Sequence, residues 1–441
     1  MQKSLVAGVS ITNVTPPVGL QLCGYPYYCR QNTGVHDPLY ASCIVLDNGE
    51  CKVAIVAADL VGFTKRITRN VRDRVSKLTT IPAKNISLCG SHTHSGPWIF
   101  DSLNYDELKK EWKPDEAYLK ELEDKMVELV LDADSHTFEA KLGVEIGYCG
   151  KEQGVGGNRR DPAGLADPDV CVIGVKDIKD NWKACLVKYS LHPTVIHGES
   201  TLVTADYPGY MREYLKKTKP GMNMLFVQGT SGNQSTRYFR NGQTFEESER
   251  IGNAIGKEVE RVLNSMALST NVKLAVSSEE KDIELRKLPT REEAERNVRE
   301  AEEKLKKLEE NNAPYVEYQT ADLWLLGYRN ILGYIKIKEE GSKMSVRDGE
   351  IPEEVQVIRI ADAAMVCLQG ETFVEFGLEI KAKSPFKKTF VVTVANGIMA
   401  GYTCTAEAYR EGGYETGASF FTETKGELIV NTAVKLLNEI D

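Results

Sequence analysis

The 441-residue chain lacks the features that mark several protein classes. No apolar run reaches the roughly 18–20 residues that a membrane-spanning helix needs. The apolar stretch near the N-terminus, Leu5 to Val9, is shorter than the core of a signal peptide. None of the ten cysteines has CxxC spacing, and the chain has no Gly/Ser-rich linker or internal repeat. We therefore expect a cytoplasmic protein whose cysteines are mostly small buried apolar residues, not disulfides or zinc ligands.

Composition is that of an ordinary globular protein with an acidic balance. Lys and Arg number 55 and Asp and Glu 64, which gives a net charge of −9 and a pI near 5.5. A nucleic-acid binder would need a basic face to meet phosphate, so we expect no nucleic-acid partner. At about 150 residues per domain the length alone predicts roughly three domains.

Apolar strand patterns alternate with amphipathic helix patterns through most of the chain. Many strands are continuous apolar runs, which is typical of sheets covered on both faces. The pattern predicts an α/β class, with mixed sheets covered by helices. Strands are predicted at 41–47, 52–58, 86–90, 138–147, 170–176, 184–191, 223–228, 273–278, 355–360, 364–369 and 389–394, and helices at 65–79, 115–134, 207–217, 246–266, 290–312, 372–383 and 425–438.

One segment, residues 290–312, is highly charged and has an apolar stripe at helical spacing. Glu and Lys or Arg four residues apart support a long exposed helix. Two interpretations are open: a solvated surface helix with one packed stripe, or a projecting arm that forms a homo-oligomer or a lid. We predict one large domain over residues 1–441, with a charged helical insertion at about 285–350.

Histidines lie at the ends of two predicted strands. His92 and His94, in SHTHSGP, follow the strand at 86–90, and His192 ends the strand at 184–191. Strand ends that open into loops are where α/β proteins place ligand sites, and imidazole is the commonest metal ligand. If strand geometry continued past the strand, His92 and His94 would point the same way. The pattern favours a metal or catalytic site over structural histidines, and we expect His197 near that site without being a ligand.

Two further strand ends carry polar groups. The loop QGTSGNQST follows the strand at 223–228, and it is neither a nucleotide-binding P-loop nor a GxSxG nucleophile elbow. Gly229 and Gly232 allow close backbone approach, and backbone amides there are suited to an oxyanion, with a plain turn as the alternative. Glu371 follows the strand at 364–369, where a carboxylate either caps the next helix or holds a metal.

In their order along the chain, these motifs resemble the neutral/alkaline ceramidase family. The resemblance spans roughly residues 7–420 and includes AGVSITNVTPPVG, GYPYY, GVHDPLYAS, SHTHSGP, the HP after a strand, GGNRRDP, QGTSGNQS, the GE after a strand and GYTCTAEAY. It implies one zinc ion, held by His92, His192, Glu371 and Tyr402. Two imidazoles, a carboxylate and a phenol form a chemically reasonable zinc site.

The resemblance also implies the roles of other residues. His94 matches the residue that contacts the reacting carbonyl, Ser235 matches the family's nucleophile, and Arg159 matches the arginine that helps hold the substrate oxygen. This chain has Asn233 where ceramidases have Asp, and Thr236-Arg237 where they have Pro-Asn. The attacking group is therefore either Ser235 or a zinc-bound water.

The sequence predicts a zinc-dependent hydrolase that cleaves an amide bond of a small, polar acyl compound. Neither a secretion signal nor the family's C-terminal β-sandwich is recognisable, so we expect a substrate other than extracellular ceramide. Arginines near the site motifs favour a polar or anionic molecule, and the predicted substrate-binding residues are His197, Gly232, Arg237 and Arg240. Two alternatives remain: a zinc-dependent esterase or lactonase, and a non-catalytic relative that binds a small ligand.

Overall fold

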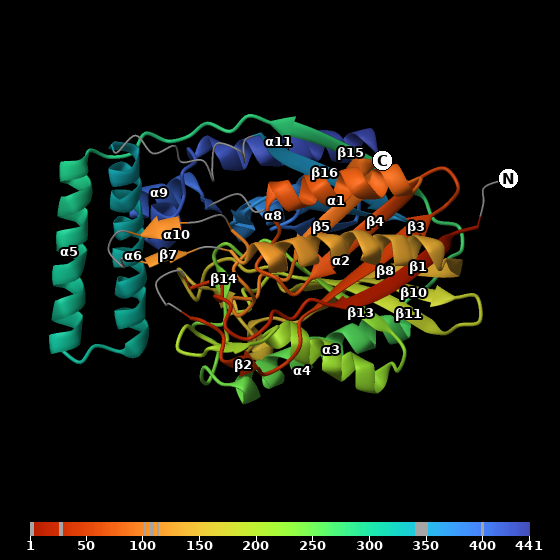
Figure 1. The fold of residues 1–441 in the computed structure, drawn as a ribbon, viewed down its shortest axis with the longest axis horizontal. Helices are drawn as coiled ribbons and strands as arrows, with labels where there is room; N and C mark the ends of the chain where they lie inside the picture. Colours follow the sequence, from red (N-terminus) through yellow and green to blue (C-terminus); the bar gives the residue numbers. More distant parts are fainter. Residues whose placement is uncertain are drawn as a thin grey trace.

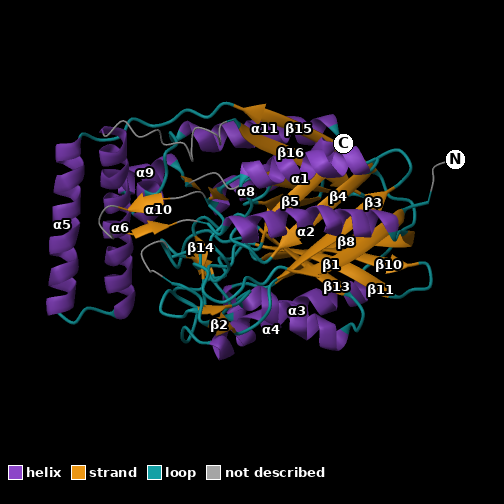
Figure 2. Cartoon of the chain, in the orientation of Figure 1, coloured by secondary structure: helices purple, strands orange, loops and turns teal. Residues whose placement is uncertain are grey.

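The strands of the chain form two large sheets and four short two-stranded pairs (Figures 1 and 2). This is a computed structural model, and it describes residues 4–25, 30–100, 103–105, 110–112, 114–339, 352–397 and 401–441. The short pairs are β2 (Gly34–Val35) with β12 (Leu202–Val203), β9 (Gly157–Asn158) with β14 (Gln234–Ser235), β18 (Glu371–Thr372) with β20 (Tyr402–Thr403), and β6 (Leu103–Tyr105) with β7 (Lys110–Trp112).

The larger sheet has eight strands and the smaller has four. Within them only the pairs β11–β13, β4–β5 and β17–β19 are parallel. In spatial order the larger sheet contains β13 (Asn223–Gln228), β11 (Trp182–Tyr189), β10 (Asp169–Asp177), β8 (Phe138–Tyr148), β1 (Val6–Asn13), β3 (Tyr40–Asp47), β4 (Lys52–Ala58) and β5 (Ile86–Gly90). The smaller contains β15 (Leu274–Lys281), β16 (Glu353–Ile360), β17 (Ala363–Leu368) and β19 (Lys388–Val392).

The two sheets pack face to face, and helices cover their outer faces, which makes four layers. One apolar core joins residues of both sheets, such as Ile55 and Leu186 of the larger and Met365 of the smaller. The strands are buried on both faces, and this explains their continuous apolar sequences. The larger sheet is covered by α1 (Lys65–Leu78), α2 (Glu116–Ser135), α3 (Tyr207–Thr218) and α4 (Phe245–Ser265), and the smaller by α8 (Val374–Lys383) and α11 (Thr424–Glu439).

Helix α1 shows how local sequence sets an element. Thr64 accepts a hydrogen bond from the backbone N–H of Ile67 and so caps the helix at its start. Ile67, Val71 and Val75 recur every four residues and are fully buried against the sheet. The predicted α/β class with mixed sheets covered by helices is confirmed, and the predicted strand and helix positions agree with the structure to within a few residues.

The charged insertion is a helical hairpin rather than one helix. Helix α5 (Arg291–Glu310) lies where the charge pattern predicts it, and α6 (Tyr315–Glu339) runs back beside it at one end of the molecule (Figure 1). Helix α6 has no clear apolar stripe because it is enclosed on two sides, by α5 and by the short helix α10 (Tyr414–Gly417). Helix α9 (Ala406–Glu411) precedes α10.

Hydrogen bonds bring the carboxyl ends of three strands together at one place. Past β19, the backbone N–H of Thr393 donates to Gln228 at the end of β13. The next residue, Val394, accepts from Gly90 at the end of β5. The strand ends that carry the histidines and the Gly-rich loop therefore meet, as the sequence predicts.

Two expectations about the chain's environment concern cysteines and membranes. The nine cysteines within the described residues are all free, and all but Cys51 are buried, which agrees with small buried apolar residues. Cys29 lies outside the described residues. No helix in the described part of the chain has the length and apolarity to cross a bilayer.

Candidate metal centre

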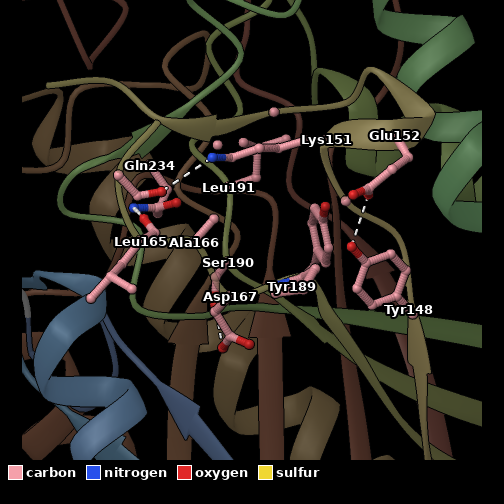
Figure 3. Close-up of a pocket in the computed structure, with 15 residues that line it drawn as sticks. Tyr148, Lys151, Glu152, Leu165, Ala166, Asp167, Tyr189, Ser190, Leu191 and Gln234 are labelled. Atoms are coloured by element: carbon pink, nitrogen blue, oxygen red, sulfur yellow. Dashed lines mark hydrogen bonds between the residues drawn. The ribbon is translucent and has the colours of Figure 1, made fainter. Parts of the chain in front are cut away.

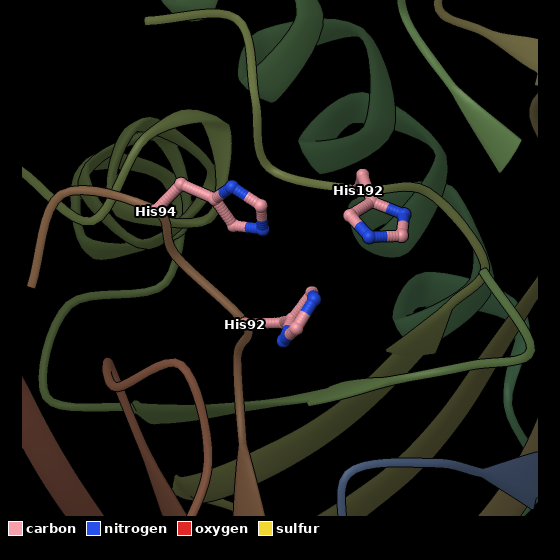
Figure 4. A group of neighbouring side chains, drawn as sticks. All are labelled: His92, His94 and His192. Atoms are coloured by element: carbon pink, nitrogen blue, oxygen red, sulfur yellow. The ribbon is translucent and has the colours of Figure 1, made fainter. Parts of the chain in front are cut away.

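Three histidines from two separate segments converge at the strand ends (Figure 4). His92 and His94 follow β5, and His192 comes three residues after β11. One ring nitrogen from each lies within 4.8 Å of those of the other two. The ring centroids of His92 and His192 are 4.8 Å apart, and those of His92 and His94 are 5.0 Å apart. Three imidazoles at such spacing could share one metal ion.

The backbone at His92 differs from the continued strand on which the sequence argument relied. Strand β5 ends at Gly90, and His92 has φ +68°, a left-handed conformation that costs free energy in a non-glycine residue. The backbone N–H of His92 donates to Leu60 and holds this turn in place. The two rings meet at 81° rather than lying side by side as on a strand. His92 and His94 lie close together, as expected, but a turn brings them together rather than a continued strand.

Backbone carbonyls determine which ring nitrogen of His92 and of His192 carries a proton. Nδ1 of His92 lies 2.8 Å from the carbonyl oxygen of Val61, and Nδ1 of His192 lies 2.6 Å from that of Ser231. A carbonyl can only accept, so each Nδ1 carries the proton and donates. Burial, followed by the charge of Arg159, lowers the pKa of His192 to about 4, and its ring is neutral near pH 7. Its Nε2 then carries a lone pair, as a metal ligand requires.

Glu371 directs one carboxylate oxygen at the same point. Its Oε2 lies 2.9 Å from Nε2 of His192 and 3.2 Å from Nε2 of His92. Burial raises the pKa of Glu371, but the two histidines outweigh it and hold that pKa well below its ordinary value. A neutral Nε2 and a carboxylate oxygen both offer lone pairs and repel each other unless a cation or a proton lies between them. The residues present therefore fit a metal ion.

Tyr402 lies beside Glu371 because two short strands pair. In the parallel pair β18–β20, Glu371 is the register partner of Tyr402. The phenol is buried, and burial followed by the charge of Glu371 raises its pKa well above the ordinary value, so it is protonated and can donate. The guanidinium of Arg159 lies 5.5 Å from the centre of the Tyr402 ring. Tyr402 lies next to Glu371, with Arg159 near its ring, and both can donate hydrogen bonds.

A buried ion-pair network holds Arg159. Its Nη2 donates to the carbonyl oxygen of Gly232 at 2.7 Å, and its Nε donates to Glu415 at 2.9 Å. The other carboxylate oxygen of Glu415 accepts from Nη1 of Arg160 at 2.8 Å. Arg160 also pairs with the more exposed Glu411. Both carboxylates come from the α9–α10 segment, against which the hairpin packs. Because Glu415 contacts both arginines, it determines where Arg159 points.

Ser235 lies in the short strand β14, directly after Gln234, which contacts His192. The carbonyl oxygen of Gln234 lies 3.1 Å from Nδ1 of His192. The hydroxyl of Ser235 accepts from the backbone N–H of Arg237 at 3.2 Å, and within the described residues it has no histidine or carboxylate partner. A serine nucleophile is usually activated by a hydrogen-bonded base. The nucleophile role of Ser235 stays a prediction.

Two of the predicted substrate-binding residues, Gly232 and His197, lie near the histidines. Gly232 packs so closely on β18 that an added Cβ would lie 2.8 Å from the carbonyl oxygen of Glu371. The ring of His197 lies 4.5 Å from that of Tyr25, and Tyr25 in turn lies 4.9 Å from His94. Both ring nitrogens of His94 are buried without a hydrogen-bond partner in the described part of the chain. His94 thus faces the centre with its hydrogen-bonding groups available.

A cavity of about 250 Å³ has none of the three histidines in its lining (Figure 3). Gln234 and Leu191 belong to its lining, and the histidines do not. Lys151 of the lining donates to the carbonyl oxygen of Pro162, and Asp167 pairs with the buried Lys188 and the partly exposed Lys381.

Two residues of the site were not identified from the sequence. Glu415 has no local motif, although two adjacent arginines in GGNRRDP imply an acid nearby. Tyr25 belongs to GYPYY, a motif that contributed only to the family resemblance. Gly24 before it allows the contact, because an added Cβ there would lie 2.4 Å from Cβ of His94.

Comparison with known proteins finds likeness in sequence profile and in fold. Residues 5–144 match the profile of the family "Neutral/alkaline non-lysosomal ceramidase, N-terminal". The neutral ceramidase from Pseudomonas aeruginosa has a similar structure, with a TM-score of 0.71 at 17% identity over 99% of this chain and 75% of that chain. A ceramidase complexed with C2 has a TM-score of 0.73 at 14% identity over the same shares. A search of curated protein sequences finds no match. The family profile thus covers about a third of the chain, and the structural likeness shows that the whole chain has the fold of these neutral ceramidases.

Proposed function

We propose that the chain is a zinc-dependent hydrolase that cleaves the amide bond of a small, polar acyl compound. The observation that carries the proposal is the convergence of Nε2 of His92, Nε2 of His192 and Oε2 of Glu371. Two imidazole nitrogens and a carboxylate oxygen that converge in this way can hold a cation, and imidazole with carboxylate is a donor set that suits zinc. The match of residues 5–144 to a ceramidase family profile supports a hydrolase.

His92, His192 and Glu371 would hold the metal, with Tyr402 as the expected fourth ligand. His94 is the alternative, because its ring nitrogens lie within the same cluster. Zinc at this place supplies Lewis acidity toward the carbonyl oxygen of an acyl substrate. The backbone carbonyls of Val61 and Ser231 hold the two imidazoles in the tautomer that binds metal.

The chain's own donors would stabilise the oxyanion that forms when the carbonyl is attacked. Tyr402 is protonated and Arg159 is positively charged, so both can donate to a negatively charged oxygen. A donor of this kind typically contributes about 2–4 kcal/mol to the transition state. His94, whose pKa burial lowers well below the ordinary value, is neutral and can donate one N–H to the substrate. Ser235 or a water molecule would be the nucleophile.

Hydrolysis of matched amides and esters tests the proposal. The panel comprises N-acyl amino acids, their neutral amides and the corresponding O-acyl esters, which differ from the amides in one atom. We expect the zinc-loaded protein to cleave amides, and we expect His192→Ala to abolish cleavage while His136→Ala, at an exposed histidine, keeps it. Fast ester turnover with no amide turnover would instead assign an esterase or lactonase. No turnover of either class would reject hydrolysis and leave a ligand-binding relative.

The Ser235→Ala variant separates the two nucleophiles. If Ser235 attacks, the variant loses at least a hundredfold in kcat, because a covalent intermediate can no longer form. If a water molecule attacks, kcat stays within about tenfold of that of the unmodified chain.

Location and partners are part of the proposal. We propose a cytoplasmic protein, which the nine free cysteines support, since disulfides are rare in reducing compartments. We also propose a small-molecule substrate without a nucleic-acid partner. A homo-oligomer formed through α5 stays a prediction.

A further inference from the structure

Two arginines beside the metal centre have no acidic partner. Residues 236–240 form one helical turn, in which the backbone N–H of Arg240 donates to Thr236. Arg237 and Arg240 are three residues apart and so lie on the same side of this turn. Arg237 donates to the carbonyl oxygen of Arg159 at 3.4 Å, and Arg240 donates to that of Thr194 at 2.8 Å. Both guanidiniums thus contact neutral oxygens, and neither forms an ion pair with any described residue.

Neighbouring arginines of the site are neutralised. Arg159 and Arg160 share the carboxylate of Glu415. Glu415 also acts on Arg237 from a distance, but its two oxygens are already occupied by ion pairs. Two positive charges therefore stay uncompensated in a place where the other charges are paired.

The acids nearest to Arg240 are occupied as well. Glu247 forms an ion pair with Arg250 at 2.7 Å. Asp206 accepts hydrogen bonds from the backbone N–H groups of Ile196 and Tyr207.

Both arginines are partly withdrawn from water and keep their charge. Burial, followed by the charge of Arg159, lowers the pKa of Arg237 to about 10, so it stays protonated near pH 7. A partly buried cation without a partner is unfavourable, and proteins usually pair such groups. No carboxylate among the described residues is in place as the partner, and an anionic ligand could take that role.

His197 connects these arginines to the metal centre. Burial and then the charges of three arginines, Arg240 first, lower its pKa to about 4, so Arg237 and Arg240 both lie within electrostatic range of its ring. The ring of Tyr25 lies between His197 and His94, at 4.5 Å and 4.9 Å. Arg240 also donates to the carbonyl oxygen of Thr194, and the backbone N–H of Thr194 donates to His192, so this guanidinium lies close to the histidine cluster.

We propose that Arg237 and Arg240 bind an oxyanion group of the substrate, a carboxylate or a phosphate, so that the site takes anionic acyl compounds. A guanidinium presents paired N–H donors that match the two oxygens of a carboxylate or phosphate. This inference rests on the proposed function for the identity of the acyl group, but anion binding itself does not depend on turnover.

The test measures binding separately from hydrolysis. Calorimetry on the full chain would compare N-acetylglycine, its neutral amide N-acetylglycinamide, and the N-acetylated aminomethylphosphonate. The variants are Arg237→Gln, Arg240→Gln and Arg240→Lys, with Arg66→Gln at an exposed position of α1 as control. Zinc content and circular dichroism confirm that each variant is folded.

We expect N-acetylglycine to bind at least tenfold more tightly than the neutral amide, and each Gln variant to lose at least tenfold. Arg240→Lys should recover part of that loss because it keeps the charge, and Arg66→Gln should not change Kd. Tighter binding of the phosphonate than of the carboxylate would assign the oxyanion as phosphate. Equal Kd for the charged and neutral ligands, or an unchanged Kd in both Gln variants, would overturn the proposal.

Hydrolysis assays on the same variants separate this inference from the proposed function. If no acyl compound is cleaved but carboxylate binding still depends on the arginines, the hydrolase fails and the anion site stands. The opposite result is that amides are cleaved, and that the ratio of kcat/KM for charged substrates to kcat/KM for neutral ones is the same in both Gln variants as in the unmodified chain. That result would reject the anion site and keep the proposed hydrolase.

Discussion

Replacement of Glu415 by Gln tests whether one buried carboxylate holds the two arginines of the site. Glu415 is 4% exposed and Arg159 is 7% exposed, and each carboxylate oxygen accepts from one guanidinium at 2.8–2.9 Å. Removing one partner of a buried ion pair costs about 3–5 kcal/mol, because it leaves a buried charge uncompensated. The amide oxygen of Gln can still accept one of the two hydrogen bonds, so we expect the lower end of that range, about 3 kcal/mol.

The melting temperature provides the measurement. Unfolding entropy is about 2.1 cal/mol/K per residue, which for 441 residues amounts to roughly 0.9 kcal/mol/K. A loss of about 3 kcal/mol therefore lowers Tm by about 3 °C for Glu415→Gln. We also expect kcat to fall, because Arg159 loses the carboxylate that orients it.

Glu411→Gln is the matched control. Glu411 also contacts Arg160, at 2.8 Å, but its side chain is 56% exposed. An exposed ion pair contributes about 0–1 kcal/mol, so Tm should change by about 1 °C or less. Equal melting temperatures for the two variants would refute the view that the buried carboxylate organises the site.

Two further predictions concern close packing and acid stability. Gly24→Ala should displace His94 and lower kcat at least tenfold, because the new Cβ would lie 2.4 Å from Cβ of His94. Gly19→Ala is the control, because Gly19 has a similar φ but open space around it, and this variant should keep full activity. Equal kcat for the two variants would contradict the prediction. Burial raises the pKa of Asp167, but the charges of Lys188 and Lys381 outweigh burial and lower that pKa. The ion pairs of Asp167 therefore stabilise the fold above about pH 4, and this stabilisation is lost as the pH falls further. Urea unfolding should therefore show Asp167→Asn to be less stable than the unmodified chain at pH 7, with the difference shrinking below pH 4; a constant difference would contradict the ion-pair explanation.

Local patterns predicted most of the fold because the strands are fully buried. Continuous apolar runs gave β4, β5 and β13 at their observed bounds, Lys52–Ala58, Ile86–Gly90 and Asn223–Gln228. Helix α6 escaped prediction since it is enclosed by two neighbours and shows no single apolar face. Periodicity reports burial on one face, so an element enclosed by several others loses the signal.

The histidines of the site were identifiable since they end strands, and strand ends collect ligand groups in α/β folds. Contacts between residues far apart in the chain could not be predicted from the sequence in the same way. The pair β18–β20, which sets Tyr402 beside Glu371, has only two residues in each strand, too few for a periodic pattern. Glu415 reaches Arg159 across more than 250 residues of sequence, and no local feature reports such a contact. The left-handed backbone at His92 was also invisible, because a non-glycine residue gives no sign of it.

Zinc content tests the central claim most directly. We expect the purified, zinc-loaded chain to hold about one zinc ion per molecule after dialysis, measured by mass spectrometry of the metal. His92→Ala, His192→Ala and Glu371→Ala should each lose most of that zinc, because each removes one of the three converging donors. His136→Ala, at the exposed histidine beyond α2, should keep it. Zinc retained at one equivalent in all four variants, or absent from the unmodified chain, would contradict the assignment of the metal centre.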